Sequence, residues 1–448
     1  MKRLYLAASI TLLFSGGFAQ ALTLQEAIGS AERIDPQVQS ALASSDAARA
    51  GIQIARSRLL PVVQGVGSYG RTNQTANQLD PVLGTTSQSF SNSTPSSQLF
   101  LRQALFNMAS WAGLGVSELQ NEFGLMKLAG VYGDLWLRVS NSWLDLVVAQ
   151  ETLDIQTNAE QSMAQVALQA QKAYDAGIAT KEAALESKAQ LAFVRSNAIE
   201  ARLNLAARQR NLIALTGIDA ISLQRVHLNF SKRYKTLVGS EQAFKDRIAE
   251  VSPEIAAVKI TEGIRRMQLK QATAAHAPTV DFFTAYQQTQ SANINQINLG
   301  VISTQAAVQL SIPFYAGGLH QGQERQAAAF VESASADVRA TELRLNTAIH
   351  TSWATQGAQL DRALALEEMV TAGQEVVNAY RMGIKAGLKS WSDVANAEVV
   401  LTRRRVDQVN AIASLLKAQA QLLSFLPVTD ENWHVWLNGL AFETKRVK

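Results

Sequence analysis

The sequence predicts an α+β membrane protein made of a duplicated half-repeat, with four transmembrane β-strands and very long α-helices in each chain. Three observations predict this fold. The two halves share landmarks at a nearly constant offset, each half contains two strand-like stretches of about ten residues, and each half contains about 60 to 70 residues without proline or a turn cluster. At 448 residues, a size prior alone would predict about three domains. The repeat favours two structural halves instead.

The first residues resemble an export signal. Lys2 and Arg3 precede an apolar stretch over residues 4–18, and Ala19-Gln20-Ala21 is typical of a cleavage site. We therefore expect a signal peptide over residues 1–21, rather than a retained helix, because the apolar stretch is shorter than the roughly 20 residues that cross a bilayer. No later run of 18 apolar residues occurs, which leaves an exported soluble protein or an outer-membrane barrel.

Composition excludes several classes of protein. The chain has 0 cysteines, which excludes disulfide scaffolds, Cys-ligated metal sites, thiol catalysis and a lipid anchor on an N-terminal cysteine. Its net charge of +4 is scattered along the sequence, so no nucleic-acid partner is expected. Hydrophobic residues make up 47% of the chain, enough to build a folded core.

The repeat sets the expected organisation of the chain. Pro36 and Pro61 in the first half correspond to Pro253 and Pro278 in the second, both with an offset of 217 residues. Further pairs are Leu105-Phe106 with Pro313-Phe314, and Gly177 with Gly387. We expect a first repeat over residues 22–216, a linker over 217–240, a second repeat over 241–428 and a C-terminal tail over 429–448.

Each repeat reads as helix, strand, loop, strand, long helix, helix. The predicted strands cover residues 62–71, 97–106, 279–288 and 306–315, and the second-half strands alternate clearly between apolar and polar side chains. Ten residues with a tilt near 45° match the crossing length of an outer-membrane strand. The Ser, Thr, Asn and Gly-rich segments Thr72–Ser96 and Thr289–Thr304 have no apolar periodicity, so we expect exposed loops there.

The remaining segments are predicted to be helical. Asn107–Tyr174 and Gln321–Arg381 each can form one helix of about 100 Å at 1.5 Å per residue. The second contains a coiled-coil-like seam at Val331, Val338, Leu345, Ile349, Trp353, Leu360 and Leu364. Shorter helices are expected over 24–60, 178–216, 240–277 and 388–426.

The number of strands predicts an oligomer. Four strands cannot close a barrel, and an open sheet edge in lipid leaves backbone groups without hydrogen-bond partners. Two copies would supply 8 strands around a filled interior, whereas three would supply 12 strands around a lumen. Three copies would also supply twelve helical rods that continue the barrel.

These features together resemble the TolC-like outer-membrane efflux and type I secretion channels over about residues 22–428. The resemblance rests on Asp35-Pro36 and Ser252-Pro253, on Leu60-Pro61 and Ala277-Pro278, on residues 311–318, and on residues 388–397. It implies a homotrimer with a twelve-strand barrel in the outer-membrane lipid and a periplasmic helical tunnel. It also implies two partners, a membrane-fusion adaptor and an inner-membrane pump of the ABC or RND type.

The resemblance also implies a gate where the helical hairpins turn. The family's basic gate residue matches Lys389, its acidic partners match Asp393 and Asn396, and its aromatic residue matches Ile384, with Tyr380 one turn earlier. The acid of the first repeat matches Ala183, beside Glu182. The alternative to a gate role is that Lys389 and Asp393 form an ordinary exposed i,i+4 ion pair, which would stabilise the helix by about 0.3 kcal/mol. Three glycines are expected to permit the turns: Gly177, Gly383 and Gly387.

Two other classes of function compete with a channel. An enzyme is disfavoured because the sequence shows no catalytic, metal or cofactor motif, and Gly317-Gly318 is not followed by a phosphate-loop lysine. The five histidines are isolated from one another in sequence: His227, His276, His320, His350 and His434. A structural periplasmic coiled coil or adhesin would explain the long helices but not the matched strands. The cargo of a channel, drug or secreted protein, is left open, with a weak lean toward the non-lipidated branch of the family.

Overall fold

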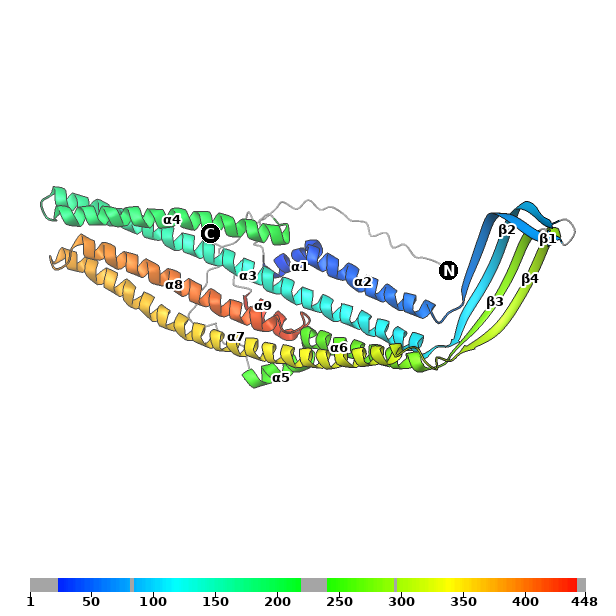
Figure 1. Ribbon diagram of the computed structural model, residues 1–448. Coiled ribbons are helices and arrows are strands. Elements are labelled where there is room, and N and C mark those ends of the chain that lie inside the picture. The colour runs from blue at the N-terminus through cyan, green and yellow to red at the C-terminus, as the bar shows by residue number, and fades with distance from the viewer. Residues whose placement is uncertain (1–22, 81–83, 219–239, 294–295, 441–448) are drawn as a thin grey trace, which may run out of the picture. The chain divides into compact units, whose positions relative to one another are not determined.

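The computed structural model describes residues 23–80, 84–218, 240–293 and 296–440. The predicted signal peptide and nearly all of the predicted linker lie outside the described residues. In chain order the elements are α1 (Leu24–Ile34), α2 (Pro36–Ser57), β1 (Val62–Asp80), β2 (Gly84–Phe106), α3 (Met108–Asp175), α4 (Lys181–Thr216), α5 (Glu241–Val251), α6 (Pro253–Thr273), η1 (Ala274–His276), β3 (Thr279–Asn293), β4 (Gln296–Ser311), α7 (Leu319–Lys385), α8 (Trp391–Leu423) and α9 (Glu431–Leu440). The order helix, helix, strand, strand, long helix, helix occurs twice (Figure 1).

The chain divides into two compact units, and each combines segments from both repeats. Unit 1 comprises Met1–Gln39, Ala129–Ser252 and Asn346–Lys448, and unit 2 comprises Ser40–Leu128 and Pro253–Leu345. Unit 2 contains all four strands, and unit 1 contains the two turns that connect α3 to α4 and α7 to α8. The sheet and the hairpin turns therefore belong to different units.

The two long helices confirm the prediction from sequence. Helix α3 has 68 residues and α7 has 67, about 100 Å each. In the predicted α7 seam, Leu345 and Ile349 are fully buried, whereas Leu364 is exposed in the isolated chain. None of the helices in the described ranges has both the length and the apolarity required to cross a membrane.

The first short helix of each repeat is broken in two, where the sequence predicted one continuous helix. In the first repeat α1 ends before Asp35, whose carboxylate accepts hydrogen bonds from the backbone N–H groups of Gln37 and Val38 at 2.8 and 3.0 Å and so caps α2. In the second repeat the break falls at Ser252 before Pro253. A proline disfavours helical geometry in the preceding residue, so the Pro at each position ends one helix and begins another.

The four strands of the described ranges form one antiparallel sheet in the order β1-β2-β3-β4, and no other described segment pairs with the outer side of β1 or β4 (Figure 1). The strands have 19, 23, 15 and 16 residues, much longer than the predicted ten. The predicted loops Thr72–Ser96 and Thr289–Thr304 were therefore wrong over most of their length. In Thr72–Ser96 most residues are polar whichever face they lie on, and cross-strand hydroxyl pairs support the strands there, such as Ser68 with Ser96 at 2.7 Å.

The predicted end of the fourth strand was also wrong. Strand β4 ends at Ser311 rather than at residue 315. Pro313 has no backbone N–H to donate to a neighbouring strand, so the ladder stops there. Phe314 and Tyr315 lie beyond the sheet and are highly exposed.

Helix α9 packs into unit 1 through a cluster of tryptophans. Trp433 is fully buried, with its ring 5.3 Å from that of Trp136 on α3 and 5.8 Å from that of Trp436. The indole N–H of Trp436 donates to Gln419 of α8 at 3.1 Å. Before the helix, the buried Asp430 accepts hydrogen bonds from Arg247 of α5 at 2.6 and 3.0 Å. Residues 430–437 thus connect α3, α5 and α8 within this unit.

Candidate gate at the helical hairpin turns

The two hairpin turns of unit 1 have the same backbone geometry. Gly177 and Gly387 adopt φ values of +75° and +70°, a left-handed conformation that favours glycine. At each turn the next residue donates its N–H back to the last helical turn, from Ile178 to Ala173 at 2.8 Å and from Leu388 to Gly383 at 2.9 Å. This is the Schellman type of helix end. The glycine prediction therefore agrees with the geometry at two of its three positions.

A hydroxyl side chain starts the returning helix of each hairpin. Thr180 accepts a hydrogen bond from the N–H of Ala183, and Ser390 accepts one from the N–H of Asp393, both at 3.2 Å. Capping of this kind satisfies backbone donors that the first helical turn leaves unpaired. Both turns lie at the same end of unit 1, where α3 meets α4 and α7 meets α8 (Figure 1).

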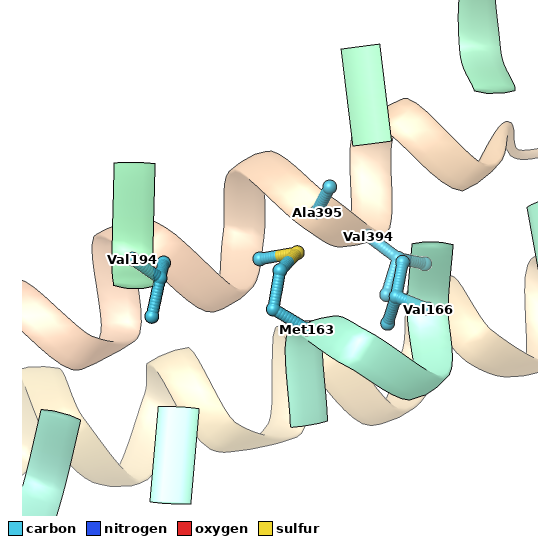
Figure 2. Packing of buried hydrophobic residues seen from close by; sticks show 5 residues of the cluster. All are labelled: Met163, Val166, Val194, Val394 and Ala395. Carbon is cyan, nitrogen blue, oxygen red and sulfur yellow. The ribbon is translucent and has the colours of Figure 1, made fainter. Parts of the chain in front are cut away.

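An apolar cluster joins the helices next to the turns. Its buried members come from three helices, as Figure 2 shows: Met163 and Val166 from α3, Val194 from α4, and Val394 and Ala395 from α8. Partly buried side chains of α7, among them Tyr380 and Ile384, pack against it. Ile384 and Tyr380 therefore have one side in this cluster, and Trp391 packs there as well.

Lys389 contacts an aromatic ring rather than a carboxylate. Its ammonium nitrogen lies 4.1 Å from the centre of the Tyr380 ring, a cation–π contact. Within the described residues no ion pair joins Lys389 to Asp393, so the alternative i,i+4 pair is not formed in this structure. The remaining glycine, Gly383, has no positive φ and lies inside α7. A Cβ at this position would lie only 2.9 Å from the Cγ of Lys389, so glycine leaves the space that this side chain occupies.

Asp393 is held by the start of its own helix. Its carboxylate accepts hydrogen bonds from both the backbone N–H and the hydroxyl of Ser390, each at 2.9 Å, completing a capping box. These hydrogen bonds, with a smaller contribution from the charge of Lys389, lower the pKa of the Asp393 carboxyl below its usual value. Asp393 is therefore ionised at neutral pH and stabilises α8 locally.

Asn396 connects the two hairpins. Its amide nitrogen donates to the carboxylate of Glu186 at 3.1 Å, and its amide oxygen accepts from the side chain of Gln190, also at 3.1 Å. Glu186 and Gln190 lie one turn apart on α4, so one residue of α8 holds two successive turns of the other hairpin. Of the residues that the sequence proposed for the gate, Asn396 alone makes a polar contact between the hairpins in the described residues.

Glu182 lies apart from this link. It is exposed in the first turn of α4, where its charge suits the positive end of the helix dipole. No hydrogen bond or ion pair of Glu182 is present within the part of the chain that the structure describes. Its neighbour Ala183 is buried against the hairpin.

Sequence reasoning missed a second polar link, which lies two residues further along α8. Arg381 of α7 pairs with the buried carboxylate of Glu398 on α8 at 2.5 Å, and Ser162 of α3 donates to the same carboxylate at 3.0 Å. The repeat offset could have identified Glu186, because adding 210 residues gives 396. No comparable signal in the sequence points to Glu398.

Several kinds of noncovalent contact hold the side chains near the turns. The links are hydrogen bonds, a cation–π contact and one ion pair, all of which can break and re-form as helices move. Among the described residues no group of three His, Asp or Glu side chains is arranged to hold a metal ion.

Long paired helices and a four-stranded sheet with unpaired edges are together the fold of outer-membrane channel proteins. Among solved structures, the outer membrane protein VceC from Vibrio cholerae superposes with a TM-score of 0.74, at 16% identity over 94% of this chain and 97% of that chain. The fold class predicted from sequence is confirmed.

Sequence comparison supplies the family. The chain belongs to the outer membrane efflux protein family, whose profile matches residues 27–218 and 246–426. It is 26% identical to the proteases secretion protein PrtF of Dickeya chrysanthemi, over 89% of this chain and 86% of that protein. It is 23% identical to the outer membrane protein TolC of Escherichia coli K12, over 98% and 89%. The family is one of export channels of the outer membrane, and the predicted channel function is confirmed at that level.

Proposed function

We propose that three copies of this chain form one outer-membrane channel that exports cargo delivered by an inner-membrane pump through a periplasmic adaptor. The observation that carries the trimer is the sheet itself, which has two unpaired edges, β1 and β4. Pairing β1 of one copy with β4 of the next seals both edges, and three copies supply twelve strands around a lumen. Two copies would supply only eight strands, whose interior side chains would fill.

The trimer is tested by its mass. Light scattering of the protein extracted from outer membranes in mild detergent should give three times the protomer mass after subtraction of the detergent. Migration in gel electrophoresis should also change on heating, because a closed barrel resists the detergent until it is boiled. A stable monomer or dimer would contradict the proposal.

We also propose that the hairpin turns form the closed periplasmic mouth of this channel. A gate needs contacts that are stronger in one state than in the other. The contacts between Asn396 and Glu186 and Gln190 join one hairpin to the other, and they would have to break if the hairpins separate. The contact of Lys389 with the Tyr380 ring and the capping hydrogen bond between Ser390 and Asp393 stabilise the second turn. Glu182 and Ile384 are candidates for contacts with neighbouring copies.

For the cargo we propose a secreted polypeptide, with drugs as the alternative. The support comes from relatives: PrtF and the alkaline protease secretion protein AprF of Pseudomonas aeruginosa carry protease secretion in their names. The partner class is then a membrane-fusion adaptor with an ABC-type pump, whereas drug export would favour an RND-type pump. Purification of the channel after crosslinking in cells, followed by mass spectrometry, distinguishes the two pump types directly.

A further inference from the structure

The two faces of the sheet differ in chemistry over the nine residues of β1 and the ten residues of each other strand that lie nearest the helices. Residues directly opposite each other across a ladder share a face, so the strand registers assign every position. One face is mainly apolar, with Val63, Leu99, Leu101, Phe282, Val308 and Leu310 among its residues, and it carries two glutamines, Gln103 and Gln288. The opposite face is more polar and carries five glutamines among apolar residues such as Phe100 and Phe283: Gln64, Gln98, Gln287, Gln305 and Gln309.

The glutamine face also carries the only two charged side chains of these four stretches, residues 62–70, 97–106, 279–288 and 302–311. They are Arg102 on β2 and Asp281 on β3, and they form an ion pair of 3.1 Å between neighbouring strands. Arg102 is opposite Phe283, and Asp281 is opposite Ala104, so the two charges are diagonal neighbours on one face. The next charge along β1, Arg71, lies beyond the apolar stretch.

The surroundings of each face follow from the cost of burying polar groups. Five amides and two charges facing hydrocarbon would lose hydrogen bonds to water that nothing in lipid replaces. Apolar side chains meet no such cost, and strands of outer-membrane barrels alternate between a lipid face and a lumen face. The apolar face therefore suits lipid, and the glutamine face suits water.

We propose that Arg102 and Asp281 form a charge-compensated ring on the water-filled wall of the barrel, which lets the barrel pass cargo of either charge sign. This inference rests on the proposed three-copy barrel. Three copies place three arginines and three aspartates at one level, with a net charge of zero. Glutamine amides both donate and accept hydrogen bonds, so the rest of the wall favours neither sign and suits an extended polypeptide, whose backbone offers both groups.

The compensation has a measurable consequence. Removing either Arg102 or Asp281 would leave three like charges facing the lumen. Neighbouring positions on the wall lie within about one Debye length of these charges at 0.1 M salt, so screening does not abolish their effect there. Coulomb's law with this screening predicts that the local concentration of an ion changes by somewhat under twofold, in opposite directions for anions and cations. The ratio of the local cation concentration to the local anion concentration should then change by about threefold.

The experiment uses the fact that the chain contains 0 cysteines, so one introduced cysteine is a unique reporter. Gln309 lies directly opposite Asp281 on the glutamine face, and its neighbour Leu310 lies on the apolar face. In the detergent-free trimer in liposomes, Gln309→Cys should react with the charged reagents MTSET and MTSES. Leu310→Cys should react only after denaturation. The reagents can enter from outside, so the result does not depend on the gate.

Charge variants then test the ring. In the Gln309→Cys background, Asp281→Asn should lower the ratio of the MTSET rate to the MTSES rate by about threefold, and Arg102→Gln should raise it by a similar factor. In matched controls with Ser303→Cys, about 20 Å away along the same face at 3.4 Å per residue, neither variant should change the ratio appreciably.

The possible results separate the two proposals. If the protein is not trimeric, the proposed function fails. If the trimer is intact but Leu310→Cys reacts and Gln309→Cys does not, the faces are reversed and the inference fails. Equal ratios of the MTSET rate to the MTSES rate with the wild-type residues, with Asp281→Asn and with Arg102→Gln would also contradict the inference, because they would show that neither charge affects ions in the lumen.

Discussion

Replacing Asn396 with alanine should open the proposed gate. The substitution removes two hydrogen bonds between α8 and α4, to Glu186 and from Gln190. Both are exposed, so each is worth about 0.5–1 kcal/mol, at the low end of the range for intramolecular hydrogen bonds. The loss is then about 1–2 kcal/mol per chain and about 3–6 kcal/mol for three symmetric copies. A shift of about 5.5 kcal/mol takes a two-state equilibrium from 1:99 to 99:1, so the closed state would lose most of its advantage.

The assay is single-channel conductance of the purified trimer in planar bilayers. We expect a larger mean conductance for Asn396→Ala than for the wild type, and greater sensitivity of cells to large antibiotics that the closed channel excludes. Trimer yield should not fall, because alanine favours the helix more than asparagine does. The matched control is Asn410→Ala, at an exposed asparagine of the same helix whose side chain makes no hydrogen bond within the described residues.

A double-mutant cycle identifies the contact itself. If the link acts as proposed, Glu186→Ala alone should raise conductance, and adding Asn396→Ala should raise it by less than the sum of the single effects. Fully additive effects would mean that the two residues act independently. Unchanged conductance in Asn396→Ala with an intact trimer would refute the reasoning and would leave the hydrogen bond from Ser162 of α3 to Glu398 of α8 as the candidate contact between the hairpins.

Three further predictions concern other parts of the chain. Trp433→Ala should destabilise the protein by about 3–5 kcal/mol, because it leaves a large cavity under α9, and thermal melting should show this loss while the exposed control Val435→Ala melts like the wild type. Burial opposes ionisation of Asp430, but hydrogen bonds from Asn432 and Arg247 outweigh burial and lower the pKa of its carboxyl. The ionised carboxylate therefore stabilises the fold above the ordinary pKa of about 3.9, and this stabilisation is lost as the pH falls through the lower pKa of the folded state. The decrease in melting temperature between pH 7 and pH 3 should accordingly be smaller in Asp430→Asn than in the wild type. A peptide tag inserted at Gly84, where β2 begins at the far end of the first strand pair, should bind antibody on intact cells, and binding only after the outer membrane is disrupted would reverse the topology.

The long helices were predictable because they depend on local features. Between Asn107 and Tyr174 no proline interrupts the chain, and each hairpin turn is marked by a glycine that adopts a positive φ. The strand lengths were not predictable in this way. Beyond the residues nearest the helices β1 and β2 are rich in Ser, Thr, Asn and Gln, so the sequence there has the composition of a loop, and pairing between the strands decides the structure.

The gate residues show the same difference between features that are local in sequence and contacts between distant helices. Asn396 was found by resemblance, but its partners Glu186 and Gln190 were not, because a contact between hairpins depends on how α4 and α8 pack and not on spacing within either helix. Lys389 and Asp393 have the spacing of an ion pair, yet each has a nearer partner. Asp393 accepts hydrogen bonds from Ser390 at the helix start, and Lys389 lies over the ring of Tyr380 on the preceding helix.

The contact between Glu186 and Asn396 records how the duplicated chain diverged. The two residues occupy equivalent positions of the two repeats, so in an ancestor with identical halves each position would have faced a copy of itself. Two glutamates there would repel each other, whereas an acid and an amide form a hydrogen bond. At this pair of equivalent sites the two repeats now differ, so the contact has an amide donor on one hairpin and a carboxylate acceptor on the other.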